Sequence, residues 1–406
     1  MRFFVRNTTR TLLLSIFSIS MMTSGPARAD ETAWQEIVKA ANGQTVYWNA
    51  WGGGDVYNAY IAWVADRVST EYGVTVEHVK LSDTAEAVRK VLAERTAGRV
   101  SDGSVDLIWI NGENFKAMKD NALLYGPITD KLPNFQLVDT KALPATILDF
   151  TVPTDGLESP WGQAKLVFIH DTAILEEPPR SIDAILQYAK DNPGRITYPA
   201  PPDFTGTTFL KQVLYSNVED PSVLLRPAGE NFDTVTAPIW RYLDDITPSL
   251  WRKGNDYPKS GTALVQLLDD GEIDLAFSFV VGEASTAITE GRLPKTARSF
   301  VLDGGTIGNV HFVAIPFNAA AKEGAMVVAN FLLSPEAQAH KLSPEVWGEP
   351  TVLAIDRLGD NERALFEAVS QHEATLAPDE LGNTLPEPHP SWMTQIEETW
   401  LRRYGS

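Results

Sequence analysis

The sequence contains no cysteine at any of its 406 positions. This absence excludes disulfide-stapled folds, cysteine-ligated zinc, iron–sulfur clusters, thiol nucleophiles and a lipid-modified N-terminal cysteine. Basic residues are also scarce, because 34 Lys and Arg stand against 53 Asp and Glu. The formal charge of −19 argues against nucleic-acid binding, which needs a basic face. A chain of this length with 44% hydrophobic residues suits two lobes with sizeable cores.

Long apolar runs are scarce as well. The run near the N-terminus, Leu12–Met22, is shorter than the roughly 20 residues of a membrane span. Three arginines precede it, and Ala27-Arg28-Ala29 gives the small-x-small pattern of a cleavage site. Residues 1–29 are therefore interpreted as a signal peptide cleaved after Ala29, which predicts an exported, periplasmic protein. Cleavage removes four arginines and no acid, so 30 basic residues remain against 53 acidic ones, a net charge of −23.

The rest of the chain alternates apolar strands with amphipathic helices, a pattern typical of α/β sheets. Residues 45–48 are predicted to form a strand that runs into a glycine-rich turn at 49–55. Residues 105–110 form a near-continuous apolar run, which indicates a central parallel strand covered on both faces. A similar unit follows at 273–279 and ends in a second Gly-Glu turn, Gly282-Glu283.

An ordered set of segments gives the chain a resemblance to a known family. The segments are Trp48–Gly53, Asp106–Asn114, Pro160–Gly162, Asp203–Gly206 and Ala329–Ala337. With the export signal and the acidic composition, they resemble an extracytoplasmic solute-binding protein of an ABC importer, which has the type II periplasmic-binding fold. The similarity is greatest to a branch related to thiamine-, polyamine- and iron-binding members.

The resemblance implies an α/β fold of two lobes joined by two crossing strands. It places residues 30–160 and 311–406 in the first lobe and 161–310 in the second, with crossings near 161–170 and 304–315. It further implies a monomer that is not an enzyme, needs no cofactor, closes around a small molecule and delivers it to the membrane permease of an ABC importer.

Ligands of open α/β sheets lie outside the carboxyl ends of the strands, close to free N–H groups at helix N-termini. Three segments of this sequence satisfy that condition, namely 51–55, 111–114 and 278–283. Two further candidates are the hydroxyl-rich helix start at 205–208 and Trp161, which precedes a crossing strand. The candidate ligand-binding residues are Trp51, Gly53, Asp55, Asn111, Glu113, Asn114, Trp161, Thr205, Gly206, Thr207, Ser278 and Glu283.

Each candidate also has a purely structural interpretation. Trp51 and Trp161 could be core residues, and a carboxylate such as Asp55 at a helix start commonly opposes the helix dipole. Thr205 or Asp203 could simply cap a helix. Trp347 could reach the rim of a cleft or pack elsewhere.

The nature of the ligand stays open between three classes. Indole faces, carboxylates and the acidic chain favour an organic cation. A sugar would also stack on indole, and an anion could bind at residues 205–208. No metal is expected, because the six histidines form no metal-spaced pair and no two tyrosines are adjacent.

The alternative from another class is an exported hydrolase of the glycosidase kind, with Glu113 and Glu283 as paired carboxylates. The chain has neither a Gly-x-Ser-x-Gly elbow nor a cysteine nucleophile, which disfavours other hydrolases.

Overall fold

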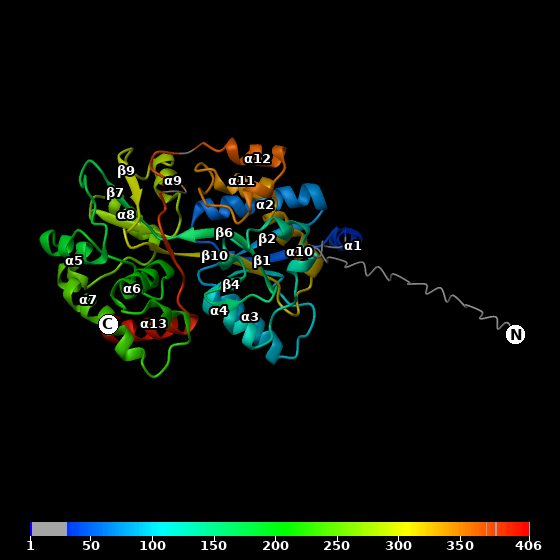
Figure 1. Cartoon of the computed structure of the whole chain (residues 1–406), viewed down its shortest axis with the longest axis horizontal. Helices are drawn as coiled ribbons and strands as arrows, with labels where there is room; N and C mark the ends of the chain where they lie inside the picture. Colours follow the sequence, from blue (N-terminus) through cyan, green and yellow to red (C-terminus); the bar gives the residue numbers. More distant parts are fainter. Residues whose placement is uncertain (2–30, 371, 378–379, 406) are drawn as a thin grey trace.

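A computed structural model of the chain describes residues 1, 31–370, 372–377 and 380–405 (Figure 1). The expected cleavage position after Ala29 lies outside the described residues. In residues 31–405, as far as they are described, no helix combines the length and apolar character that a membrane crossing requires.

The helices and strands alternate through most of the chain. The α-helices are α1 (Glu31–Ala41), α2 (Asp55–Tyr72), α3 (Ala85–Thr96), α4 (Gly112–Asp120), α5 (Ile182–Asp191), α6 (Phe204–Asn217), α7 (Phe232–Ile246), α8 (Gly261–Asp269), α9 (Glu283–Thr289), α10 (Lys322–Leu332), α11 (Pro335–Leu342), α12 (Asp360–Glu367) and α13 (Pro390–Tyr404). The strands are β1 (Thr45–Trp51), β2 (Thr75–Leu81), β3 (Leu107–Ile110), β4 (Leu148–Asp149), β5 (Val152–Pro153), β6 (Glu158–Lys165), β7 (Val167–Asp171), β8 (Leu275–Ser278), β9 (Ala297–Phe300), β10 (Thr306–Ala314) and β11 (Thr384–Leu385). Short 3-10 helices are η1 (Thr129–Lys131), η2 (Pro133–Leu137), η3 (Pro144–Thr146), η4 (Pro221–Leu225), η5 (Thr247–Ser249), η6 (Trp251–Gly254) and η7 (Ile355–Arg357).

The first lobe is built on the larger sheet, whose strands run in the order β11-β10-β3-β1-β2, with β6 also paired to β10. β1 is parallel to β2 and β3, whereas β10 is antiparallel to β3 and β6. The apolar run of β3 is central, as expected, because apolar clusters cover both faces of the sheet. Trp48 and Leu107 belong to one cluster, and Ile108 and Ile110 belong to the other.

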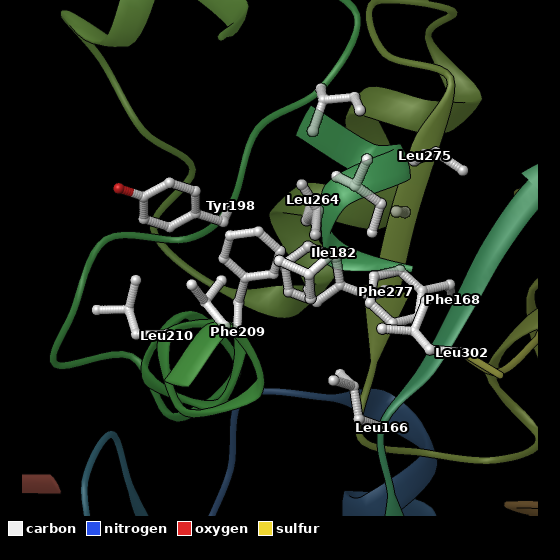
Figure 2. Packing of buried hydrophobic residues seen from close by; sticks show 14 of the residues in the cluster. Leu166, Phe168, Ile182, Tyr198, Phe209, Leu210, Leu264, Leu275, Phe277 and Leu302 are labelled. Atoms are coloured by element: carbon white, nitrogen blue, oxygen red, sulfur yellow. The ribbon is translucent and has the colours of Figure 1, made fainter. Parts of the chain in front are cut away.

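The second lobe is built on the smaller sheet β8-β7-β9, in which β7 is antiparallel to both neighbours. Figure 2 shows its core, where Phe168 and Phe277 of the sheet face Phe209 of α6. The rings of Phe209 and Phe277 stack at a centroid distance of 5.3 Å. Apolar side chains of α5 and α8, such as Ile182 and Leu264, complete this core.

Two strands carry the chain between the lobes. β6 of the first sheet runs into β7 of the second after Leu166, and β9 of the second sheet is followed by β10 of the first. β6 and β10 pair with each other from Lys165↔Gly308 to Glu158↔Ala314. The expected α/β fold of two lobes joined by two crossing strands is confirmed.

The C-terminal helix differs from the expectation that residues 311–406 belong to the first lobe. Trp392, Ile396 and Trp400 of α13 are buried in the core of the second lobe, and Figure 1 shows α12 at one lobe and this helix beside α6 of the other. On the way, β11 pairs with β10, and Lys165 Nζ donates a hydrogen bond to Asn383 O at 3.0 Å. The sequence indicates an apolar face on this helix but not which lobe covers it.

Candidate functional site

A cavity of about 610 Å³ lies between the two lobes. Its walls come from the carboxyl ends of β1, β3 and β8 and from the first turns of α4, α6, α8 and α9. Ligands of α/β sheets bind at such strand ends, near exposed helix N–H groups. The crossing strands contribute Ala164, Asn309 and His311 to the same cavity.

An aromatic surface forms one part of the first-lobe wall. Trp51, the last residue of β1, is half-buried, and its ring packs against Tyr57 at a centroid distance of 4.8 Å. A Cβ on Gly53 would lie 2.5 Å from the Trp51 ring, and one on Gly54 would lie 2.6 Å from the Tyr57 ring. The glycine turn therefore leaves the room in which these two rings pack against each other.

The start of α4 forms the polar part of the same wall. Asn111 precedes the helix, and Asn114 Nδ2 donates a hydrogen bond to Glu113 Oε1 at 2.9 Å. The N–H of Gly112 donates to the buried carboxyl of Asp149 at 2.7 Å, which holds this helix end in place. Burial raises the pKa of Glu113 to about 6.

The second-lobe wall begins at α6. Asp203 caps this helix, because its carboxylate accepts from Thr205 N at 3.0 Å and Gly206 N at 3.1 Å. The capping interpretation of this segment is therefore confirmed for Asp203, and two N–H groups that an anion would need are already bound. Burial raises the pKa of Asp203 to about 6.

A third carboxyl group enters the cavity from the C-terminal helix. Glu397 of α13 accepts a hydrogen bond from Thr207 Oγ1 at 2.8 Å. Burial raises its pKa to about 7, and the neighbouring charge of Glu113 also raises it. Two acidic groups from different lobes thus lie within electrostatic reach of each other across the cavity.

A buried polar network of Lys341, His311 and Glu349 reaches the cavity at the first-lobe wall. Glu349 is bound by Lys341 Nζ at 2.6 Å and by His311 Nε2 at 2.8 Å, and all three side chains are almost fully buried. Lys341 also donates to Trp161 O and lies 5.5 Å from the Trp347 ring centroid. Burial lowers the pKa of both Lys341 and His311. The network fixes Glu349 and His311, which both line the cavity.

Comparison with known proteins identifies the family of this two-lobe chain. Residues 63–354 match the family described as bacterial extracellular solute-binding protein. The chain belongs to this family. It is also 45% identical over 395 residues to Protein YnjB of Escherichia coli (strain K12), a match that covers 97% of each chain.

Solved structures with the same fold are solute-binding proteins as well. The periplasmic binding protein AfuA from Actinobacillus pleuropneumoniae, with fructose-6-phosphate bound, has a TM-score of 0.63 at 14% identity and matches 89% of this chain and 99% of its own. A putative spermidine/putrescine ABC transporter protein from Listeria monocytogenes has a TM-score of 0.62 at 16% identity, with 89% and 98% covered. At these identities the similarity shows the fold alone. The alternative of an exported hydrolase is not favoured by the family or by these neighbours.

In this solute-binding protein, the structure brings together seven of the twelve residues predicted from the sequence. The predicted residues that line the cavity are Trp51, Asn111, Glu113, Asn114, Thr205, Ser278 and Glu283. Glu283 lies 3.6 Å from the Arg292 guanidinium and 3.4 Å from Ser278 Oγ.

The other five predicted residues do not line the cavity. Gly53 and Asp55 are exposed at the turn before α2 and in its first residue. Trp161 is fully buried and packs against the Trp109 ring at 5.0 Å, as its structural interpretation proposed. Gly206 and Thr207 are buried within α6, and a Cβ on Gly206 would lie 2.0 Å from a backbone oxygen.

Several cavity residues of the solute-binding protein were absent from the prediction. They include Tyr57, Asp83, His311, Glu349 and Glu397, while Trp347, named as an open possibility, also lines the cavity. Their positions depend on packing between distant segments. Within the described part of the chain, no group of three or more His, Asp or Glu side chains is arranged to hold a metal ion.

Proposed function

We propose that this solute-binding protein is a periplasmic receptor for a small organic cation, which it captures by closure of its two lobes and delivers to the permease of an ABC importer. The observation that carries the proposal is the lining of the cavity. Six carboxyl groups face one lysine and one histidine; they belong to Asp83, Glu113, Asp203, Glu283, Glu349 and Glu397. Such a surface attracts positive charge.

The ion-pair partners of the cavity carboxylates support this argument. Glu349 is neutralised by Lys341, and Glu283 lies near Arg292. By contrast, Glu113 and Glu397 form no ion pair among the described residues, and Lys211 beside them is bound to Glu387 at 2.6 Å. A ligand cation is therefore the partner that these two acids lack.

Aromatic side chains supply the second element of cation recognition. Trp51, Tyr57, Trp109, Phe204 and Phe279 all line the cavity. An ammonium group within about 6 Å of such a ring is attracted by the negative ring face, and this attraction is stronger where water is excluded.

The proposed route to the periplasm rests on the sequence. We expect the exported protein to be a monomer that begins at Asp30, after removal of the signal peptide at Ala29. Intact-mass measurement of protein purified from a periplasmic extract would test the cleavage position, and size-exclusion chromatography with light scattering would test the monomer.

The ligand class is tested by calorimetry with a panel of cations, sugars and sugar phosphates. We expect a cation to bind and Glu397→Gln to weaken its binding by about tenfold, the effect of losing one charge-assisted contact. The matched control is Glu398→Gln, since Glu398 is the next residue of α13, is exposed and does not line the cavity. Exclusive binding of neutral sugars or anions, or equal affinities for both variants, would contradict the cation proposal.

A further inference from the structure

The two lobes touch at a pair of glycines beside the cavity. Gly282 immediately precedes α9 in the second lobe, and Gly348 follows Trp347 in the first. A Cβ on Gly282 would lie 2.6 Å from Gly348 Cα, and a Cβ on Gly348 would lie 2.7 Å from Gly282 Cα. The two backbones therefore meet directly, with no room for a side chain between them.

This contact lies at the rim of the cavity and not at a distant point of the surface. On the second-lobe side, Val280 and Glu283 line the cavity, and on the first-lobe side Trp347 and Glu349 do so. One turn further along α9, Thr286 Oγ1 donates a hydrogen bond to Pro344 O at 3.0 Å. The two lobes thus touch along the rim at the glycine pair and again at Thr286.

The first-lobe side of the contact is held firmly in place. Gly348 N donates to Ser343 O at 2.9 Å, and the adjacent Glu349 carboxylate is bound to Lys341 and His311 in the buried network. The contacts of Glu349 therefore tie the residue after Gly348 to α11 and β10.

On the second-lobe side, Gly282 is bound to the first turn of α9. Gly282 O accepts hydrogen bonds from Ser285 Oγ at 2.7 Å and from Thr286 N at 3.0 Å. A side chain introduced between the two backbones would therefore push against the start of α9, and so against the second lobe.

We propose that the Gly282–Gly348 contact is the stop that sets how closely the lobes approach, which makes this glycine pair a determinant of solute size. The inference rests on the proposed function, because a stop matters only in a protein that closes. Carbon atoms in contact ordinarily lie about 3.5–4.0 Å apart, so one added methyl group would widen the rim by about 1 Å.

The sharpest variant is Gly282→Ala. Gly282 has φ −85° and ψ 3°, a conformation that alanine adopts without strain, so the variant adds volume between the lobes without straining the backbone. Gly304→Ala is the matched control, because a Cβ there would meet no atom within 4 Å. Thermal unfolding of both variants without solute checks that each is folded, and we expect melting temperatures close to that of the wild type.

The separation of the lobes can be followed by fluorescence energy transfer. The chain has no cysteine, so Leu92→Cys on α3 and Ile174→Cys after β7 would carry the only labels. Both positions are exposed, at 42% and 60%. The probes are choline, thiamine and spermidine, which are organic cations of different size, and calorimetry with the same three compounds gives their affinities.

We expect the wild type and Gly304→Ala to reach a short inter-lobe distance with a probe, and Gly282→Ala to stop at a longer one. Gly282→Ala should bind the smallest accepted cation at least about tenfold more weakly and lose less for larger ones. If all three proteins reach the same short inter-lobe distance, the proposal that the glycine pair limits closure is wrong, whereas the proposed receptor function is unaffected. If the wild type never reaches a shorter distance, with or without probes, lobe closure itself is contradicted, and the stop with it.

Discussion

At the scale of single residues, the most unusual group outside the cavity is Glu158 on β6. It is 1% exposed, and neither of its carboxyl oxygens has a hydrogen-bond partner among the described residues. Burial and the negative charge of Asp149 raise the pKa of Glu158 well above its usual range. The folded protein therefore binds a proton at this residue more tightly than the unfolded chain does.

This shift predicts a pH-dependent loss of stability that Glu158→Gln removes. Above the ordinary glutamate pKa of about 4.3, the unfolded chain releases the proton while the folded protein keeps it. The free energy of unfolding should then fall as pH rises, by up to about 1.4 kcal/mol per pH unit for this one group. Urea titrations of wild type and variant between acidic and neutral pH would measure the difference.

The quantity to compare is the slope of the free energy of unfolding against pH. The cost of burying an amide does not depend on pH, so it leaves this slope unchanged. Glu398→Gln, a change of the same type at an exposed residue, provides the control and should retain the slope of the wild type. Parallel curves for the wild type and Glu158→Gln would contradict a raised pKa at this position.

At the scale of elements, the C-terminal helix connects the second-lobe core to the site. Its apolar face lies in the second-lobe core, while Glu397 and Met393 on the same helix line the cavity. Trp400 anchors this arrangement, because it is 2% exposed and its Nε1 donates to Tyr198 OH at 3.0 Å. Loss of the anchor should disturb the position of Glu397.

We expect Trp400→Ala to lower the free energy of unfolding by about 3–5 kcal/mol, the usual cost of removing a large buried aromatic side chain. Leu401→Ala is the control on the next residue of the helix, because Leu401 is 47% exposed and should cost no more than about 0.5 kcal/mol. Chemical denaturation gives both values. Equal losses in the two variants would show that α13 is not anchored through Trp400.

The same helix shows what a sequence pattern can and cannot predict. The spacing of Trp392, Ile396 and Trp400 predicts an amphipathic helix, since local periodicity reports a buried face. It cannot report which lobe buries that face, because this depends on contacts with residues that are distant in sequence. The assignment of 311–406 to the first lobe fails at α13 for this reason.

Some cavity residues are likewise predictable from local sequence, whereas others are placed by contacts between distant segments. Trp51 and Glu113 could be proposed from sequence because Trp51 ends one strand and Glu113 lies three residues beyond the end of another, and the ends of parallel strands share one edge of a sheet. Glu349 and Glu397 follow no strand. Their places are set by a buried lysine and a packed helix that are distant in sequence from the strands of the site.

At the scale of the whole molecule, the net negative charge and the acidic cleft both favour the approach of cations. The chain carries a formal charge of −19, and the cavity between its lobes is lined by more carboxyl groups than basic ones. The summed field of such a protein draws cations toward the cleft, and salt screens this attraction beyond about 8–10 Å. Screening therefore acts mainly on the rate of encounter, because contacts inside the closed cavity are shorter than this distance.

This argument predicts that the association rate of a bound cation falls as salt is added, while its dissociation rate changes little. If choline is that cation, its association rate should drop by about tenfold between low and high ionic strength. Stopped-flow tryptophan fluorescence can follow the binding, because Trp51, Trp109 and Trp347 line the cavity. The neutral analogue 3,3-dimethyl-1-butanol has the same shape without the charge, so any binding of it should be insensitive to salt. An association rate for choline that is unchanged or rises with salt would mean that the negative field of the protein plays no part in capture.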